Sequence, residues 1–453
     1  MNDLHAALTE AGITAVTDGD ILAAHSMDHA RLVPPGRAVA LVKARSTEEV
    51  SAVLRVAGRL GVPVVPQGAR TGLAGSATAV DGAILLDVSP MDAILTIDPI
   101  DRIAVCQPGV PNAAISRAAA EHGLRYAPDP GSWETSTIGG NIATAAGGMC
   151  CVKYGVTAEY VLGLEVVTAS GEVMRCGRRT AKGVAGYDLV RLFCGSEGTL
   201  GVITEATVKL SPIPAERLTL AAVFDTTAAA GRAVTAIMAS GAQPSLLELI
   251  DGVHLRALEE LRPMGLPTDA AALLLVAADA DPEAELVAIE GLCEGAGATE
   301  VYRATDATEA DALLESRRSA YHAMERLGTV LVDDVAVPRS KLAEALDGVA
   351  AAAERHGVVI GVIAHAGDGN LHPNIVVHPE DPASVAAGKA AFDEILEMTL
   401  AMGGTITGEH GVGMLKRDWL AKEVDPVNLA VQRRIKEALD PQGILNPGKV
   451  LAD

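Results

Sequence analysis

Aromatic residues are scarce in this sequence: Trp, Tyr and Phe together make up 2% of its 453 residues. Hydrophobic residues nevertheless account for 49% of the chain, so the core must be built from Ala, Val, Leu and Ile. A chain of this length predicts two to three domains with ample core. No apolar run reaches the roughly 20 residues that a membrane-spanning helix needs.

Positive charge is also in short supply. The chain has 36 Lys and Arg against 58 Asp and Glu, which gives a formal net charge of −22. This balance argues for a soluble protein and against nucleic acid or anionic membrane as a partner. Residues 1–5 carry no Lys or Arg, so no secretory signal is predicted. We expect the protein in the cytoplasm, either free or peripheral to the membrane.

Cysteines are few and lack the spacing of metal fingers or iron–sulfur sites. Without a secretory signal they are expected to be reduced thiols. The sequence also has no Gly-x-Gly-x-x-Gly that opens a helix, so a nicotinamide dinucleotide is not predicted. The six cysteines are Cys106, Cys150, Cys151, Cys176, Cys194 and Cys293.

Two histidines flank a predicted turn in the C-terminal half. The pair Asp368-Gly369 stands between the apolar runs 358–364 and 371–377, which is typical of a β-hairpin. In such a hairpin His365 and His372 face each other near the turn. Each histidine taken alone is more often structural than functional.

A carboxylate beside a third imidazole, Glu409-His410, follows in a Gly-rich segment. Two imidazoles and one carboxylate are a common ligand set for a divalent transition metal with open positions. The concentration of His, Asp, Glu and Gly in two short segments of an Ala/Val/Leu-rich chain therefore predicts a candidate metal site.

Three Gly-rich segments interrupt the N-terminal half. Segment 67–75 follows a predicted strand, and its backbone suits either close approach to a phosphate or a flexible connection. Segment 128–148 has side chains too small to form a core alone, and such backbone suits a large flat ligand. Segment 195–201 leads into a predicted strand over 202–210.

Hydrophobic periodicity and turn residues predict the other elements. A capping box at 46–49 begins a helix, and Pro212 and Pro214 mark the best domain boundary. Beyond that boundary the pattern predicts strands over 218–224, 246–250, 272–277 and 330–337, and helices over 226–239, 282–294, 307–326, 341–355, 384–401 and 427–439.

Three segments in this order resemble the FAD-binding half of the vanillyl-alcohol-oxidase type flavoproteins. They are 68–73 (GARTGL), 137–155 (beginning TIGGN and ending KYG) and 195–204 (GSEGTLGVIT). The C-terminal motifs at 365–372, 408–411 and 444–448 are similar to one branch of these proteins. That branch contains the flavin-dependent D-2-hydroxyacid dehydrogenases: D-lactate dehydrogenase, the glycolate oxidase flavin subunit and D-2-hydroxyglutarate dehydrogenase.

The resemblance spans about residues 34–451 and implies an α+β fold. A two-lobed PCMH-type FAD-binding domain would occupy 34–212. An α+β FAD-linked oxidase C-terminal substrate domain would occupy 213–453, with the tail near 444–449 returning to the flavin. No histidine lies near 68–73, so FAD is expected to be held non-covalently. By motif position, the FAD-binding residues would be Gly68, Ala69, Arg70, Thr71, Gly72, Leu73, Pro130, Gly131, Thr137, Gly139, Asn141, Ala143, Thr144, Glu197, Gly198, Ile203 and Asn446.

The same resemblance implies a metal-assisted oxidation. His365, His372 and Glu409 match the ligands of a divalent metal, which would be Zn, Mn or Fe, and His410 matches the catalytic base. A divalent cation on the substrate hydroxyl and carboxylate lowers the cost of forming an alkoxide. The imidazole then takes the hydroxyl proton, while hydride leaves the α carbon for the flavin.

Substrate contacts are also implied. Arg317 falls where the family places a carboxylate-binding arginine, and Arg318 is the alternative. Asn374 matches a substrate-contacting polar position, and Tyr321, one turn beyond Arg317, would line the pocket. Relatives that act on 2-hydroxyglutarate carry a lysine where this chain has Val332, so a monocarboxylate such as D-lactate or glycolate is favoured.

Three other interpretations of the function remain open. The chain could be an alditol or other alcohol oxidase of the same fold, a metal-dependent hydrolase with a Gly-rich scaffold, or a non-catalytic flavin electron-transfer subunit. The electron acceptor would be a quinone, a carrier protein or dioxygen. The expected assemblies are a homodimer or a complex with other oxidase subunits.

Overall fold

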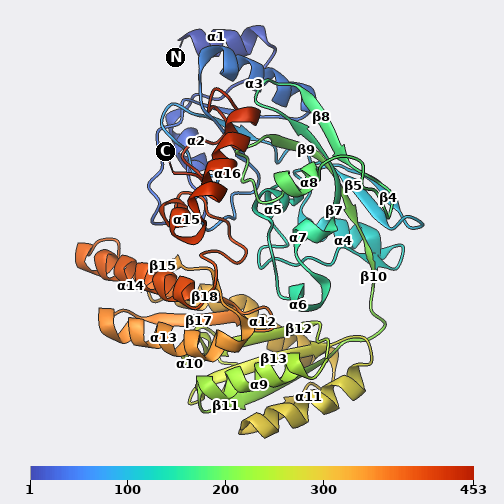
Figure 1. Cartoon of the computed structure of the whole chain (residues 1–453), viewed down its shortest axis with the longest axis vertical. Coiled ribbons are helices and arrows are strands. Elements are labelled where there is room, and N and C mark those ends of the chain that lie inside the picture. Colours follow the sequence, from blue (N-terminus) through green and yellow to red (C-terminus); the bar gives the residue numbers. More distant parts are fainter. Residues whose placement is uncertain (1, 453) are drawn as a thin grey trace. The chain divides into compact units, whose positions relative to one another are not determined.

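The computed structural model describes residues 2–452 (Figure 1). The described chain forms two compact units, each built from separate stretches of sequence. The first unit contains the residues up to Gly147, Val156–Ile213 and the residues from Glu409 onward. The second contains Gly148–Gly155 and Pro214–Gly408. No helix among the residues described is long and apolar enough to cross a membrane, and none of the six cysteines, all within the described part, forms a disulfide.

Two main sheets build the first unit. One is parallel, with three strands in the order β1-β3-β2, and the other is antiparallel, with five strands in the order β4-β5-β9-β7-β8. A short pair, β6 and β10, stands apart. The strands are β1 (Ala40–Lys43), β2 (Val64–Gln67), β3 (Ile84–Asp87), β4 (Ile94–Asp98), β5 (Ile103–Cys106), β6 (Leu124–Arg125), β7 (Val161–Val167), β8 (Val173–Gly177), β9 (Val202–Lys209) and β10 (Ser211–Pro212). The helices are α1 (Asn2–Glu10), α2 (Gly19–His25), α3 (Thr47–Leu60), α4 (Asn112–Ala120), α5 (Ile138–Thr144), α7 (Thr157–Tyr160), α8 (Leu189–Phe193), α15 (Arg417–Glu423) and α16 (Pro426–Leu439).

Helix α3 begins where the capping box predicts. The Ser46 hydroxyl accepts a hydrogen bond from the Glu49 backbone N–H at 3.3 Å. The Glu49 carboxylate accepts in turn from the backbone N–H of Arg45 at 2.8 Å, one residue before the cap. This pairing satisfies backbone donors at the helix start. The helix ends at Gly61, which takes the left-handed conformation typical of a C-terminal cap.

The C-terminal tail completes the small parallel sheet. The backbone N–H of Val64 on β2 donates to Ile444 at 2.7 Å, and that of Asn446 donates back to Val64 at 2.8 Å. Leu445 is fully buried in the same core as β1, β2 and β3. The chain's last segment is therefore a structural part of the first unit.

An eight-stranded sheet forms the second unit. Its order is β14-β11-β13-β12-β17-β18-β15, and β16 also pairs with β18. The strands are β11 (Leu218–Phe224), β12 (Leu246–Asp251), β13 (Ala272–Ala278), β14 (Glu300–Arg303), β15 (Thr329–Val332), β16 (Val335–Ala336), β17 (Ile360–His365) and β18 (Asn370–Val377). The helices are α6 (Cys151–Tyr154), α9 (Thr227–Ala239), α10 (Gly252–Leu261), α11 (Pro282–Ala296), α12 (Ala307–Glu325), α13 (Leu342–His356) and α14 (Pro382–Ala401), with a 3₁₀ turn over Arg339–Lys341.

The two faces of this sheet differ in character. Successive strand residues point to opposite faces. On β18 the Asn374 amide reaches His254 of α10, whereas Val377 lies against Gly388 of α14. Helices α10 and α14 therefore cover opposite faces. Since Asn374 and His372 are two residues apart, they share the α10 face, which carries polar side chains.

A short segment of the N-terminal half, Gly148–Gly155, belongs to the second unit. Its helix α6 is held by Lys153, whose Nζ lies 2.5 Å from the Asp279 carboxylate, and by the Tyr154 hydroxyl, which donates to the same carboxylate at 2.6 Å. A Cβ added at Gly367, in the β17–β18 turn, would meet the Val152 side chain at 2.5 Å. This segment therefore packs directly on the β17–β18 turn.

Most predicted elements are present, but the strand predicted over 330–337 is wrong as a single strand. It is broken into β15 and β16 at Asp333 and Asp334. The Asp333 carboxylate accepts from the Asp334 backbone N–H at 2.9 Å, a local bond that competes with the strand ladder.

Periodicity missed several elements, among them helices α5, α10 and α15 and strand β14. Helix α5 lies in the Gly/Ala-rich segment that was expected to form no core. It packs because a glycine allows close approach: a Cβ at Gly139 would lie 2.5 Å from Pro108.

Candidate functional site

The β17–β18 hairpin forms as predicted. Its register pairs Ile363 with His372 and His365 with Asn370, so both histidines lie on the same face. Their rings are nearly perpendicular, with centroids 5.0 Å apart, and both side chains are buried. The prediction that the two imidazoles face each other near the turn is confirmed.

Sequence reasoning missed Glu248, a fully buried carboxylate on β12 that pairs in register with His365. Glu248 Oε1 lies 2.7 Å from His365 Nδ1, and Oε2 lies 2.7 Å from Arg317 Nε. The Arg317 contact is an ion pair without the alignment of a directed hydrogen bond. The available signal was a single Glu within the apolar run 246–250, but its partners lie far along the chain.

The two candidate arginines of α12 differ in their exposure to solvent and in their partners. Arg317 is 7% exposed and tied to Glu248, whereas Arg318 is exposed. Among the described residues the terminal amino groups of Arg317 have no hydrogen-bond partner. Tyr321, one turn further along, is half-buried, and its ring lies 5.7 Å from that of His322.

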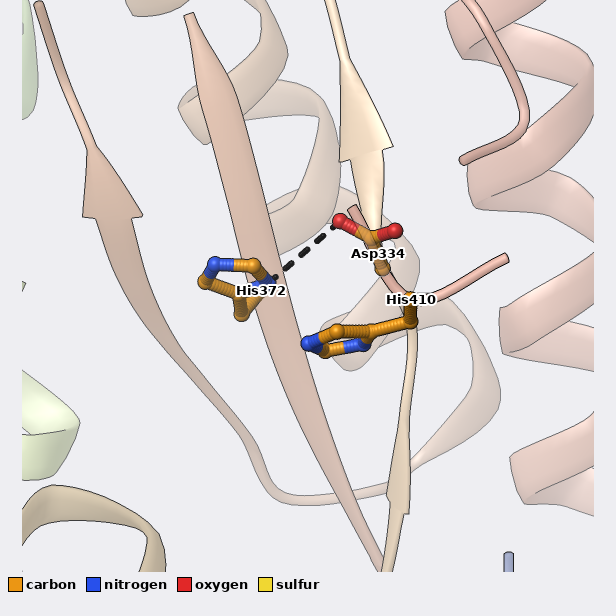
Figure 2. Close-up of side chains that lie close together, drawn as sticks. All are labelled: Asp334, His372 and His410. Atoms are coloured by element: carbon orange, nitrogen blue, oxygen red, sulfur yellow. Dashed lines mark ion pairs between the residues drawn. The ribbon is translucent and has the colours of Figure 1, made fainter. Parts of the chain in front are cut away.

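Asp334 is a second residue that sequence reasoning missed as a site residue. Its carboxylate lies 3.6 Å from His372 Nδ1 and accepts from the Thr407 hydroxyl at 2.7 Å. Figure 2 shows the Asp334–His372 ion pair with His410 close by. Two adjacent buried aspartates in an apolar segment, Asp333 and Asp334, were the signal in the sequence.

Two groupings among the described residues lie close enough together to hold a metal ion. One is His365, His372 and Glu409, which is the set predicted from sequence, and the other is Asp334, His372 and His410. In each, one ligand atom from every residue lies within 4.8 Å of the others. His372 is common to both. Two nitrogens with one carboxylate oxygen suit Zn, Mn or Fe.

Segment 407–413 carries Glu409 and His410 and is anchored at both ends. Thr407 bonds to Asp334 of the second unit. In the first unit, the backbone N–H groups of residues 412 and 413 donate to the Glu197 carboxylate at 2.7 and 2.9 Å. The boundary between the units falls at 408/409, so only one or two peptide bonds separate Glu409 and His410 from Gly408 in the second unit.

Asn374 is oriented by a buried chain of polar groups. Its Nδ2 lies 2.9 Å from Nε2 of His254, whose Nδ1 lies 3.1 Å from the Asp251 carboxylate. That carboxylate also accepts from the Val362 backbone N–H at 2.8 Å. Because an ionised carboxylate only accepts, His254 carries its proton on Nδ1 and the Asn374 amide donates to Nε2. The amide orientation is thereby fixed.

The predicted FAD-binding residues all lie in the first unit. The loop after β2 contacts the start of α5: a Cβ at Gly68 would lie 2.3 Å from the Thr137 hydroxyl oxygen. The loop before β9 joins the same cluster, because the Glu197 backbone N–H donates to Ala143 at 2.7 Å. Pro130 lies in a separate turn with Gly131, closed by a 2.8 Å bond from Trp133 N–H to the Pro130 carbonyl.

Two of these residues keep buried polar atoms without a hydrogen-bond partner among the residues described: Nδ2 of Asn141 and Oδ1 of Asn446. The other amide atom of Asn446, Nδ2, donates to the carbonyls of Ser76 and Glu197 at 2.9 and 2.7 Å. A buried donor and acceptor left unpaired cost stability unless a ligand pairs with them. These two unpaired atoms fit a polar cofactor such as FAD.

The carboxylate of Glu197 is fully engaged by protein. The Ser76 hydroxyl donates to it, as do the two backbone amides of segment 407–413. Burial raises the pKa of Glu197, and these hydrogen bonds oppose that shift. Nearby, burial lowers the pKa of Lys449 to about 8, opposed chiefly by the charge of Asp28. Lys449 donates to the Thr78 carbonyl at 2.7 Å, so a buried charged group binds the C-terminal tail to the chain just after the loop at 67–75.

Gly68→Ala is expected to lower FAD affinity by tenfold or more, because the added Cβ would overlap the Thr137 hydroxyl and shift the loop. The measurement is the ratio of flavin to protein absorbance after purification, followed by FAD titration. Gly291→Ala is the matched control, because a Cβ at that position meets nothing within 4 Å. Equal FAD content in both variants would contradict the assignment of this loop.

Comparison with known families identifies the chain. Residues 38–177 match the model of the FAD binding domain, and residues 213–450 match that of the FAD linked oxidases, C-terminal domain. The chain therefore belongs to the FAD-linked oxidases, in the branch that includes glycolate oxidase GlcD subunits and D-lactate dehydrogenases. The family and α+β fold class predicted from the motifs are confirmed.

Individual relatives cover nearly the whole chain. The glycolate oxidase subunit GlcD of Bacillus subtilis is 42% identical, covering 91% of this chain and 89% of the relative. The D-lactate dehydrogenase of Archaeoglobus fulgidus is 37% identical, covering 91% of each. Among solved structures, 4-ethylphenol oxidase from Gulosibacter chungangensis superposes with a TM-score of 0.79 at 19% identity, covering 99% of this chain and 97% of that one. The latter likeness concerns the fold.

Proposed function

We propose that this protein oxidises a D-2-hydroxy acid, with D-lactate or glycolate favoured, to the 2-oxo acid in an FAD-dependent, metal-assisted reaction. The observation that carries the proposal is the buried chain His365–Glu248–Arg317. It places a candidate metal ligand and a candidate carboxylate-binding cation on the two oxygens of one carboxylate. A 2-hydroxy acid presents the matching pair of groups, a hydroxyl and a carboxylate on adjacent carbons.

The FAD site would use the loop at 68–73, helix α5, the loop at 195–198 and Asn446. When bound, FAD supplies the acceptor for the hydride that leaves the α carbon. The residues themselves provide position: the absent side chain at Gly68 lets its loop pack against Thr137, and the unpaired amide atoms of Asn141 and Asn446 offer a donor and an acceptor.

The metal site would use His365, His372 and Glu409, with Zn, Mn or Fe as the ion. When bound, a divalent cation supplies Lewis-acid polarisation of the substrate hydroxyl. Glu248 keeps the proton of His365 on Nδ1, which leaves Nε2 as the ligand atom. Asp334, bonded to Thr407 and paired with His372, would orient that ring.

The remaining steps fall to three side chains. His410 would accept the hydroxyl proton, because it is a partly exposed imidazole two residues beyond the second unit. Arg317 would bind the substrate carboxylate through its terminal amino groups, for which its planar fork is suited. Asn374, with its amide fixed by His254, would contact the substrate's polar groups.

Anaerobic flavin reduction tests the proposal. The purified FAD-loaded protein is mixed with a panel of D- and L-2-hydroxy acids and with alditols, before and after chelation. D-lactate or glycolate is expected to bleach the flavin band, L-lactate is not, and chelation should abolish the reaction. Bleaching by alditols alone would favour an alditol or other alcohol oxidase. A rate of flavin reduction unaffected by chelator would remove the metal from the mechanism. A protein that binds no flavin would favour a hydrolase.

Val332→Lys is expected to shift preference toward D-2-hydroxyglutarate. Val332 stands directly across from Asn374 in the β15–β18 register, so the two side chains share a face. A lysine there would supply a cation for a second carboxylate. The measurement is kcat/KM for D-2-hydroxyglutarate divided by that for D-lactate, with an expected rise of about tenfold or more. Val332→Met controls for added volume, and an equal change in both variants would contradict the charge argument.

The proposal extends to the electron acceptor and the partners. Several relatives are named as subunits of glycolate oxidase. We therefore place this chain in an assembly with other oxidase subunits, in the cytoplasm, with re-oxidation by a quinone, a carrier protein or dioxygen. Co-purification of the chain expressed at natural levels in its own host tests the assembly.

A further inference from the structure

We propose that Glu248 is a positioning residue shared by metal binding and substrate binding. It would fix both the tautomer of His365 and the orientation of the Arg317 guanidinium. The inference rests on the proposed function and adds a residue that neither the sequence motifs nor the family resemblance assigns.

The protonation states follow from the contacts. Arg317 carries a positive charge and lies 2.7 Å from Oε2 of Glu248, so the two side chains form an ion pair. An ionised carboxylate accepts hydrogen bonds and donates none. The 2.7 Å contact with His365 therefore requires the proton on Nδ1. For the neutral ring, this leaves Nε2 as the nitrogen that can ligate a metal.

The same carboxylate sets the direction of the guanidinium. Glu248 engages Nε, on one edge of the planar group. The opposite end, with its two terminal amino groups, has no partner among the described residues. A guanidinium held by an ion pair at Nε can present its two terminal amino groups as a fork to a substrate carboxylate.

Charge gives Glu248 a third effect. A guanidinium and a divalent cation repel each other, and burial strengthens that repulsion because the effective dielectric constant is low. Glu248 is fully buried and stands between Arg317 and His365. Its negative charge would offset the repulsion, so that metal and substrate can bind together. Removing it should weaken both.

The test measures metal affinity directly. The full-length FAD-loaded protein is stripped of metal, and Mn²⁺ binding is followed by the electron paramagnetic resonance signal of the free ion, with Zn²⁺ as competitor. Glu248→Gln is expected to weaken Mn²⁺ binding about 10- to 100-fold, the usual effect of losing a group that orients a metal-ligating histidine. It should also raise the KM for D-lactate about tenfold or more, because the oriented Arg317 contact is lost.

Glu165→Gln is the matched control. Glu165 is likewise buried and paired with an arginine, Arg175, but it lies in the first unit. This variant is expected to lose stability without a change in Mn²⁺ affinity. Glu248→Asp keeps the charge but is one methylene shorter, so it should recover part of the Mn²⁺ affinity. Arg317→Lys should raise KM while leaving Mn²⁺ affinity within about twofold, which separates the two roles.

A readout on the unmodified chain covers the case in which Glu248→Gln does not fold. Imidazole ¹⁵N shifts of the metal-free protein, with His365 assigned through His365→Asn, should show protonated Nδ1 and unprotonated Nε2. The opposite tautomer would overturn the inference. So would equal Mn²⁺ affinity in wild type and Glu248→Gln, while the proposed function would stand. If wild type bound neither Mn²⁺ nor Zn²⁺, the proposed metal site would fail as well.

Discussion

Replacing His410 with alanine is expected to slow flavin reduction by the hydroxy acid roughly 10²–10⁴-fold, the range that positioned general-base catalysis contributes. An ordinary hydroxyl holds its proton at neutral pH, and an imidazole within hydrogen-bond reach can accept it as hydride departs. Because His410 lies outside the predicted FAD-binding residues, FAD content should be unchanged. Stopped-flow absorbance under anaerobic conditions measures the rate directly.

His378→Ala is the control for His410→Ala. The His378 side chain is 52% exposed and lies 3.8 Å from Glu380, away from either metal-capable grouping. Its rate of flavin reduction should match wild type. A His410→Ala variant that reduces flavin at the wild-type rate would assign the base elsewhere. A variant that loses metal as well as rate would instead place His410 among the ligands, in the grouping with Asp334 and His372.

Replacing His372 with alanine is expected to abolish metal binding and, with it, activity. His372 is the one residue common to both metal-capable groupings found in the described chain, so its loss disrupts either arrangement. A three-ligand site that loses one protein ligand retains little affinity, and we expect a fall of at least about 100-fold. Metal content by mass spectrometry and Mn²⁺ titration measure this, with FAD content as the check on folding.

Two further variants decide between the groupings. His365→Ala should remove the metal if His365, His372 and Glu409 are the ligands, whereas Asp334→Asn should remove it if Asp334, His372 and His410 are. The proposed function predicts the first outcome. Asp334→Asn would then lower affinity only moderately, since Asp334 would act through the orientation of His372. Metal retained by His372→Ala would contradict both groupings.

Local sequence signals were enough for the hairpin. Asp368-Gly369 between two apolar runs specifies a turn, and the period of two then places His365 and His372 on one face. Their partners depend on long-range pairing. Glu248 meets His365 across 117 residues of sequence because β12 lies beside β17, and no periodicity in a single sequence encodes that neighbour relation.

In the first unit, too, the sequence predicted local motifs but not the long-range contacts between them. Gly-rich motifs identified the loops, but not the tight contact between Gly68 and Thr137 that joins two of them. Helix α5 escaped prediction because Gly, Ala and Thr carry little helical periodicity, and its stability comes from packing. Asp334 lies within the strand predicted over 330–337, yet only the structure relates it to His372.

The pairing of residues 444–446 with β2 has a consequence for biosynthesis. A ribosome delivers the residues of β2 long before residues 444–446, so the small parallel sheet stays open at one edge until those residues emerge. The second unit, in contrast, has all of its sequence once Gly408 has emerged. Cofactor loading should therefore wait until residues 444–446 have emerged, and a chain arrested before them should carry no flavin.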